Sequence, residues 1–167
     1  MSDTSNPSDA ARWKKLSQAL MGLHHALIQR ARGDYERERG PVGGPTQLLR
    51  LLTSDAYFAW LRPLSELIVN IDEAAEFDEA AREKVSAAVR SSVEQLIAAP
   101  GANPLSGEFT RQYWPMVLAD PEITMVHAGV KQEISGWPRS GNGDQARALH
   151  ERHLLAEMVK QRHRPRH

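Results

Sequence analysis

One apolar stripe near the N-terminus constrains the fold of this chain more than any other feature. Large apolar side chains recur at alternating spacings of three and four residues, at Trp13, Leu16, Leu20, Leu23 and Leu27. This spacing places them on one face of an α-helix. With Asp9 as its N-cap, the helix is predicted to continue to about Arg37. A long helix with one apolar face needs other helices to cover that face, so the stripe predicts a helical bundle.

The rest of the chain carries the start and stop signals of further helices. The segment "GPVGGP" interrupts the chain, and the helices predicted after it span 46–52, 55–75, 79–99, about 109–117 and 121–134. Pro63 is expected to bend the helix over 55–75. Period-two alternation of apolar residues is absent, so no strand is indicated. We therefore predict an all-α fold: a bundle of about four main helices with short extra helices and a Pro-kinked second main helix.

Composition limits the classes of function. The 21 Lys and Arg residues balance the 21 Asp and Glu residues, so the whole chain has no general attraction to nucleic acid. There is no cysteine, which excludes disulfides, thiolate metal sites and cysteine nucleophiles. The N-terminal segment lacks the apolar region of a signal peptide, and no apolar run is long enough to span a membrane. We expect a soluble, cytoplasmic protein that does not bind membranes.

The chain is predicted to divide into a disordered N-terminus (1–8), a helical bundle domain (9–134) and a linker with a polar, basic C-terminal helix or tail (135–167). Residues 139–167 hold seven Lys and Arg against three Asp and Glu, so contact with nucleic acid or acidic partners is predicted only for this tail. One face of the tail also presents His150, His153 and Glu157, a spacing that suits a divalent metal. The alternative is a solvated polar tail.

Three polar residues fall in or beside apolar helix faces and are the candidate ligands of the bundle. His127 lies at the centre of the apolar face of the helix over 121–134, and His24 lies on the apolar side of the first helix. Asp72 lies at the edge of the buried face of the helix over 55–75. Either each group has a structural hydrogen-bond partner, or the three converge on a metal or haem, with Asp72 as a ligand or an orienting group.

A second candidate feature is a possible partner-binding surface beside the glycine-rich break. It comprises Tyr57, Phe58, Trp60 and Arg62. Aromatic side chains near an exposed loop are typical of binding surfaces. The alternative for Arg62 is a surface ion pair with Glu66, which lies one helical turn further on.

The chain lacks the familiar catalytic motifs. It has no phosphate-binding loop, no dinucleotide-binding glycine pattern, no nucleophile elbow and no His-Glu-x-x-His zinc motif. We therefore predict no catalytic residue and favour no cofactor. The leading hypothesis is a non-enzymatic helical domain that binds a partner protein or a small ligand, as a homo-oligomer. The alternative is the metal- or haem-binding bundle built on His24, His127 and Asp72.

Three segments carry a resemblance to other proteins. "YERERGPVGGPTQLLRLL", "FAWLRPLSELIVNIDE" and "VHA" resemble a group of uncharacterised bacterial all-helical proteins that share GPV-x-x-P and FAWLRPLS-like segments. The resemblance covers roughly residues 10–134 and leaves out the tail. It implies a bacterial, cytoplasmic helical domain and offers no catalytic residue to carry over.

Overall fold

The computed structural model describes residues 7–102, 107–139, 157, 158 and 160. In these residues the chain forms six α-helices, one 3-10 helix and no β-strand, which confirms the all-α prediction. The elements are α1 (Pro7–Arg39), α2 (Pro45–Ser54), the 3-10 helix η1 (Ala56–Leu61), α3 (Arg62–Ala75), α4 (Glu79–Leu96), α5 (Glu108–Ala119) and α6 (Pro121–Ser135). None of the helices in the described residues combines the length and hydropathy that crossing a membrane requires.

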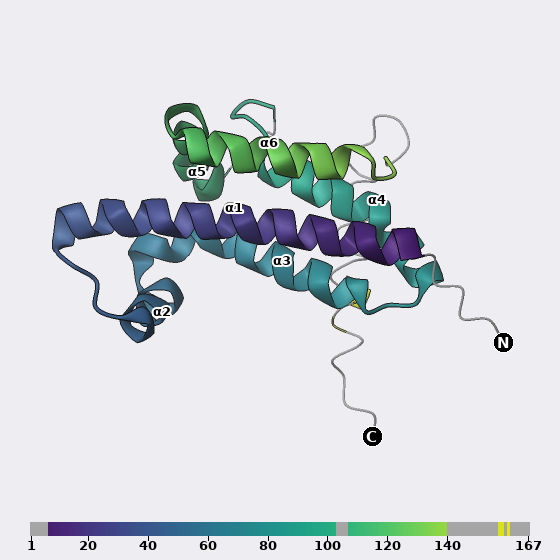
Figure 1. Ribbon diagram of the computed structural model, residues 1–167, viewed down its shortest axis with the longest axis horizontal. Coiled ribbons are helices and arrows are strands. Elements are labelled where there is room, and N and C mark those ends of the chain that lie inside the picture. Colours follow the sequence, from purple (N-terminus) through teal and green to yellow (C-terminus); the bar gives the residue numbers. More distant parts are fainter. Residues whose placement is uncertain (1–6, 103–106, 140–156, 159, 161–167) are drawn as a thin grey trace, which may run out of the picture.

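The long helix α1 is the central element of the fold. It extends across most of the molecule, with α6 along one side and α3 along the other (Figure 1). Helix α4 packs against α3 and α6, and α5 packs against α6 and η1. Because helices cover α1 from two sides, its predicted apolar stripe is buried, with no side chain more than 1% exposed: Trp13, Leu16, Leu20, Leu23 and Leu27.

Two aspartates cap the helices α4 and α6, whose first residues, 79 and 121, agree with the prediction. Asp78 caps α4 by accepting a hydrogen bond from the backbone N–H of Ala81. Asp120 caps α6 by accepting from the N–H groups of Glu122 and Ile123. These bonds satisfy N–H groups that have no acceptor inside their own helix.

The segment over 55–75, for which the sequence predicts one bent helix, contains two helical elements. Its first part is η1, capped by Asp55, which accepts a hydrogen bond from the N–H of Tyr57. The α-helix α3 begins at Arg62, so Pro63 lies in its first turn. A proline there removes no intrahelical hydrogen bond, because first-turn N–H groups have no acceptor in the helix. The chain therefore changes from 3-10 to α geometry just before the proline.

Helix α4 buries charged and polar side chains together with apolar ones. Val85 and Val89 are buried, whereas Ser92 and Leu96 are only partly buried. Five other side chains complete the buried face of the helix: Arg82, Ser86, Ala88, Arg90 and Val93. Two guanidinium groups therefore lie inside the bundle.

Each of the two buried arginines binds backbone carbonyls near the C-terminal end of a neighbouring helix. Arg82 donates hydrogen bonds to the carbonyl oxygens of Ala75, the last residue of α3, and of Phe77, two residues further on. It also forms an ion pair with Asp9 of α1 at 2.8 Å. The C-terminal carbonyls of a helix lack intrahelical donors and carry partial negative charge. Arg82 thus ties the α3–α4 turn to the start of α1.

Arg90 has the same role at the end of α6. It donates to the carbonyl oxygen of Ser135 at 3.0 Å and to that of Trp137, and it forms an ion pair with Glu94 at 2.8 Å. Trp137 is 2% exposed, and its ring lies edge-on to Trp13 with 4.8 Å between centroids. The packed core therefore extends beyond residue 134, the boundary predicted from the sequence.

The N-terminal boundary also differs from the prediction of disorder over 1–8. Residues 7 and 8 already belong to α1, and residues 1–6 lie outside the described part of the chain. Most of the predicted tail, 140–167, is likewise outside it.

Candidate binding site

The three predicted ligands His24, Asp72 and His127 each bind a different residue. Nε2 of His24 lies 3.0 Å from Oγ of Ser65, a contact between α1 and α3. Asp72 is exposed and accepts a hydrogen bond of 2.5 Å from Oγ of Ser17, also across α1 and α3. No three His, Asp or Glu side chains of the described residues form a group that could hold a metal ion, so the predicted convergence is not seen.

His127 is buried as its position in the apolar stripe suggests, with 8% of its surface exposed. Its Nδ1 lies 2.5 Å from the hydroxyl oxygen of Tyr113 on α5, and the ring of Trp114 stands edge-on to it at 5.7 Å between centroids. Burial lowers the pKa of His127, with the charge of Lys131 acting in the same direction, and burial raises the pKa of Tyr113. Both rings are therefore held neutral at pH 7, as a structural hydrogen-bonded pair joining α5 to α6.

We expect the fold to weaken in mild acid, because His127 is buried and His24 is partly buried. Burial also lowers the pKa of His24, with the neighbouring His25 contributing. A histidine whose pKa is lower in the folded state stabilises the protein fully above its unfolded value of about 6.5. Below that pH the unfolded chain binds more protons, so the free energy of unfolding falls. When the pH is lowered from 7.5 to 5, the urea concentration at the midpoint of unfolding should decrease in the wild type. We expect a smaller decrease in the double variant His24→Gln/His127→Gln. An equal decrease of the midpoint in the two proteins would contradict this expectation.

The four predicted partner-surface residues divide between the core and the surface. Phe58 and Trp60 are only 1% and 7% exposed, so they belong chiefly to the core and not to an exposed surface as the sequence suggested. The reason is that η1 turns this side of the segment against α1 and α5. Tyr57 is partly buried and Arg62 is exposed.

A cavity of about 550 Å³ opens beside Trp60. Residues of η1, α3, α4 and the start of α5 form its wall: Ala59, Trp60, Pro63, Glu66, Leu67, Asn70, Ser92, Gln95, Leu96, Gly107, Glu108, Phe109 and Thr110. The rings of Trp60 and Phe109 lie 5.8 Å apart between centroids and supply an aromatic wall. Cavities of this volume, with a mainly apolar wall and a few polar groups, are typical of small-molecule sites.

A second cavity, of about 490 Å³, adjoins the first. Its lining comes from the C-terminal half of α1, η1 and α5: Ala31, Asp34, Glu38, Ala56, Tyr57, Ala59, Trp60, Glu108, Gln112 and Met116. Ala59, Trp60 and Glu108 line both cavities. We call the two cavities together the Trp60 cleft.

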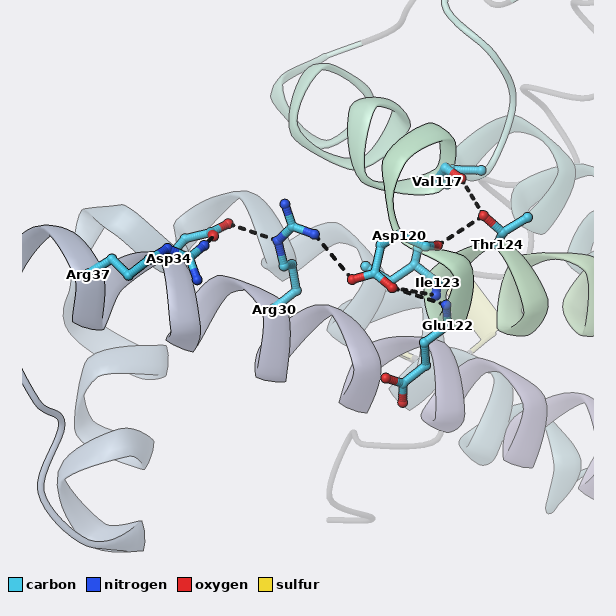
Figure 2. Close-up of polar contacts among 8 residues, drawn as sticks. All are labelled: Arg30, Asp34, Arg37, Val117, Asp120, Glu122, Ile123 and Thr124. Atoms are coloured by element: carbon cyan, nitrogen blue, oxygen red, sulfur yellow. Dashed lines mark hydrogen bonds and ion pairs between the residues drawn. The ribbon is translucent and has the colours of Figure 1, made fainter.

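An ion-pair network fixes Asp34 at one wall of the Trp60 cleft. Figure 2 shows Arg30 of α1 reaching Asp34 at 3.4 Å and the α6 cap Asp120 at 3.1 Å, while Arg37 binds the other carboxylate oxygen of Asp34. Partly exposed ion pairs of this kind contribute up to about 1 kcal/mol each. Their main effect here is positional, because they join α1 to the α5–α6 turn.

Sequence reasoning found two members of this cleft, Tyr57 and Trp60, and missed most of the others. The residues of α5 are the clearest example, because nothing in the sequence shows that Glu108 and Phe109 lie beside Trp60. Of the predicted tail ligands, His150 and His153 lie outside the described residues. Glu157 forms an ion pair with Lys160 at 3.7 Å.

Comparisons with known proteins identify no match to this chain. No protein-family model, curated protein or solved structure matches the chain.

Proposed function

We propose that this chain is a non-enzymatic helical binding domain whose ligand is a small molecule bound in the Trp60 cleft. The observation that carries the proposal is the cavity of about 550 Å³ beside Trp60, whose apolar wall is interrupted by amide, hydroxyl and carboxylate groups. Such a lining provides apolar contact together with a few directional polar contacts. The frame of the site is rigid, because the surrounding helices share one buried core.

The alternative of a metal or haem site on His24, Asp72 and His127 has no comparable support. Each of these side chains is engaged by a hydroxyl group on a different residue. The hydrogen bonds of the two histidines join helices, α1 to α3 at His24 and α5 to α6 at His127.

Filling the cleft is expected to abolish ligand binding. Ala59 is exposed and lines both cavities, so Ala59→Trp places an indole in the shared part without removing a core side chain. A library of small fragments is titrated against isotope-labelled protein and followed by NMR. We expect fragments to shift the indole resonance of Trp60 in the wild type and to bind Ala59→Trp at least about tenfold more weakly.

The matched control is Ala128→Trp, because Ala128 is exposed on α6 and lines neither cavity. This variant is expected to bind fragments as the wild type does. The proposal is wrong if no fragment shifts the resonances of cleft residues, or if Ala59→Trp and the wild type bind equally well.

Four further expectations from the sequence remain part of the proposal. We take α1, α3, α4 and α6, the four longest helices, as the frame of a bundle to which α2, η1 and α5 are added. We also propose that the chain belongs to the group of bacterial helical proteins that it resembles, acts in the cytoplasm and forms a homo-oligomer. Native mass spectrometry measures the oligomeric state and any ligand that co-purifies.

A further inference from the structure

The charged groups that line the Trp60 cleft all have the same sign. Glu66 and Glu108 line the first cavity, and Asp34, Glu38 and Glu108 line the second. No Lys, Arg or His side chain belongs to either described lining. The cleft is therefore a local region of negative charge in a chain whose total charges cancel. A cleft lined by one sign of charge concentrates ligands of the opposite sign.

Two of these carboxylates are already neutralised by arginines, and two remain available. Asp34 binds Arg30 and Arg37, and Glu108 forms an ion pair with Arg111 at 2.6 Å. Glu66 and Glu38 form no ion pair with another residue in the described part of the chain, and both are exposed. One available carboxylate therefore belongs to each cavity.

The aromatic walls also suit a cation. The guanidinium of Arg39 lies 5.6 Å from the ring centroid of Tyr57, which lines the second cavity, and 5.5 Å from that of Tyr35, which lines neither cavity. The faces of aromatic rings attract cations in this geometry. The pKa of Tyr57 is raised, first by burial and then by the negative charges of Glu38 and Asp34.

We propose that the ligand of the Trp60 cleft is a linear organic cation with two or more amino groups, bound by Glu66 in the first cavity and by Glu38 in the second. Its methylene chain lies along the shared wall of Ala59 and Trp60. This inference rests on the proposed function, since it names the chemical class of ligand for the same site. A compact cation with one charge would reach only one of the two available carboxylates.

The test uses isothermal titration calorimetry with linear diamines of about four to twelve carbon atoms at low ionic strength. Two-point binding predicts that affinity passes through a maximum with chain length, because affinity is greatest when the ligand spans the distance between the two sites. At the best length, the uncharged diol and the monoamine of the same length are the control ligands. Both are expected to bind more weakly than the diamine.

The variants Glu66→Gln and Glu38→Gln remove one negative charge each while keeping the shape of the side chain. Each is expected to weaken diamine binding by about fivefold, as befits an exposed ion pair. The double variant should weaken it by about 25-fold if the two contacts are independent. The matched control is Glu83→Gln, because Glu83 is exposed on α4 and lines neither cavity.

Several results would overturn the inference. One is an equal loss of affinity in Glu83→Gln, which would indicate unspecific attraction to an acidic surface. Another is a diol or a monoamine that binds as tightly as the diamine. If diamines fail to bind while neutral fragments still shift cleft resonances and Ala59→Trp abolishes those shifts, the proposed function stands and this inference alone is wrong.

Discussion

Replacing Trp13 with alanine is expected to lower the free energy of unfolding by about 4 kcal/mol, the largest effect that we expect from a single substitution. Trp13 is only 1% exposed and its ring packs edge-on against Trp137. The substitution removes a large apolar side chain where the start of α1 meets the residues that follow α6. The remaining cavity cannot close easily, because helices enclose it. Urea denaturation followed by circular dichroism measures the change.

The control for Trp13→Ala is Leu118→Ala, because Leu118 is 74% exposed. A substitution at such a position changes stability by less than about 0.5 kcal/mol. Trp13→Phe should fall between the two, since it keeps an aromatic ring in the site. A loss below about 1 kcal/mol in Trp13→Ala would show that α1 and the segment after α6 do not pack as described.

Replacing Arg90 with methionine is expected to lower the free energy of unfolding by about 3 kcal/mol. Methionine keeps much of the length and apolar stem of arginine. It cannot donate to the carbonyl oxygens of Ser135 and Trp137, which Arg90 binds inside the bundle. A buried carbonyl without a donor loses its hydration and gains no replacement. The effect is therefore larger than for a surface ion pair.

Two further variants separate this role of Arg90 from a general need for arginine. Arg111 lies on α5, its side chain is 74% exposed, and Glu108 is its partner among the described ion pairs. Arg111→Met should therefore lower the free energy of unfolding by at most about 1 kcal/mol. Arg90→Lys keeps the charge, but its single ammonium group cannot reproduce the planar fork of donors, so most of the loss should remain. Full stability in Arg90→Lys would mean that charge alone accounts for the effect.

The positions of helices could be predicted because their signals are local. The spacing of the stripe from Trp13 to Leu27 and the caps at Asp78 and Asp120 depend on residues within a few turns of one another. The buried face of α4 was harder to predict. Arg82 and Arg90 lie on that face, but arginine is ordinarily exposed, and the carbonyls they bind belong to other helices. Only the packed bundle shows why these charges are buried.

The candidate site was less predictable than the fold, because it depends on contacts between distant segments. The burial of His127 follows from its place in the stripe, but its partner Tyr113 belongs to a different helix. The same limit applies to the Trp60 cleft, in which Glu66 and Glu108 come together from α3 and α5. A helical projection gives the direction of one side chain and contains no information about what it faces.

The hydrogen bonds of His24 with Ser65 and of Ser17 with Asp72 have a consequence for how α1 and α3 align. The two bonds are seven residues apart on each helix, and the residue numbers run in opposite directions, so the helices are antiparallel. Leucines that repeat along a stripe tolerate a slip of one turn, about 5.4 Å. Such a slip would separate both polar pairs at once. The cost is largest for the partly buried His24–Ser65 pair, at most about 1 to 3 kcal/mol, because the exposed Asp72 can bind water instead. The apolar stripes therefore hold the helices together, and these two polar pairs set the register.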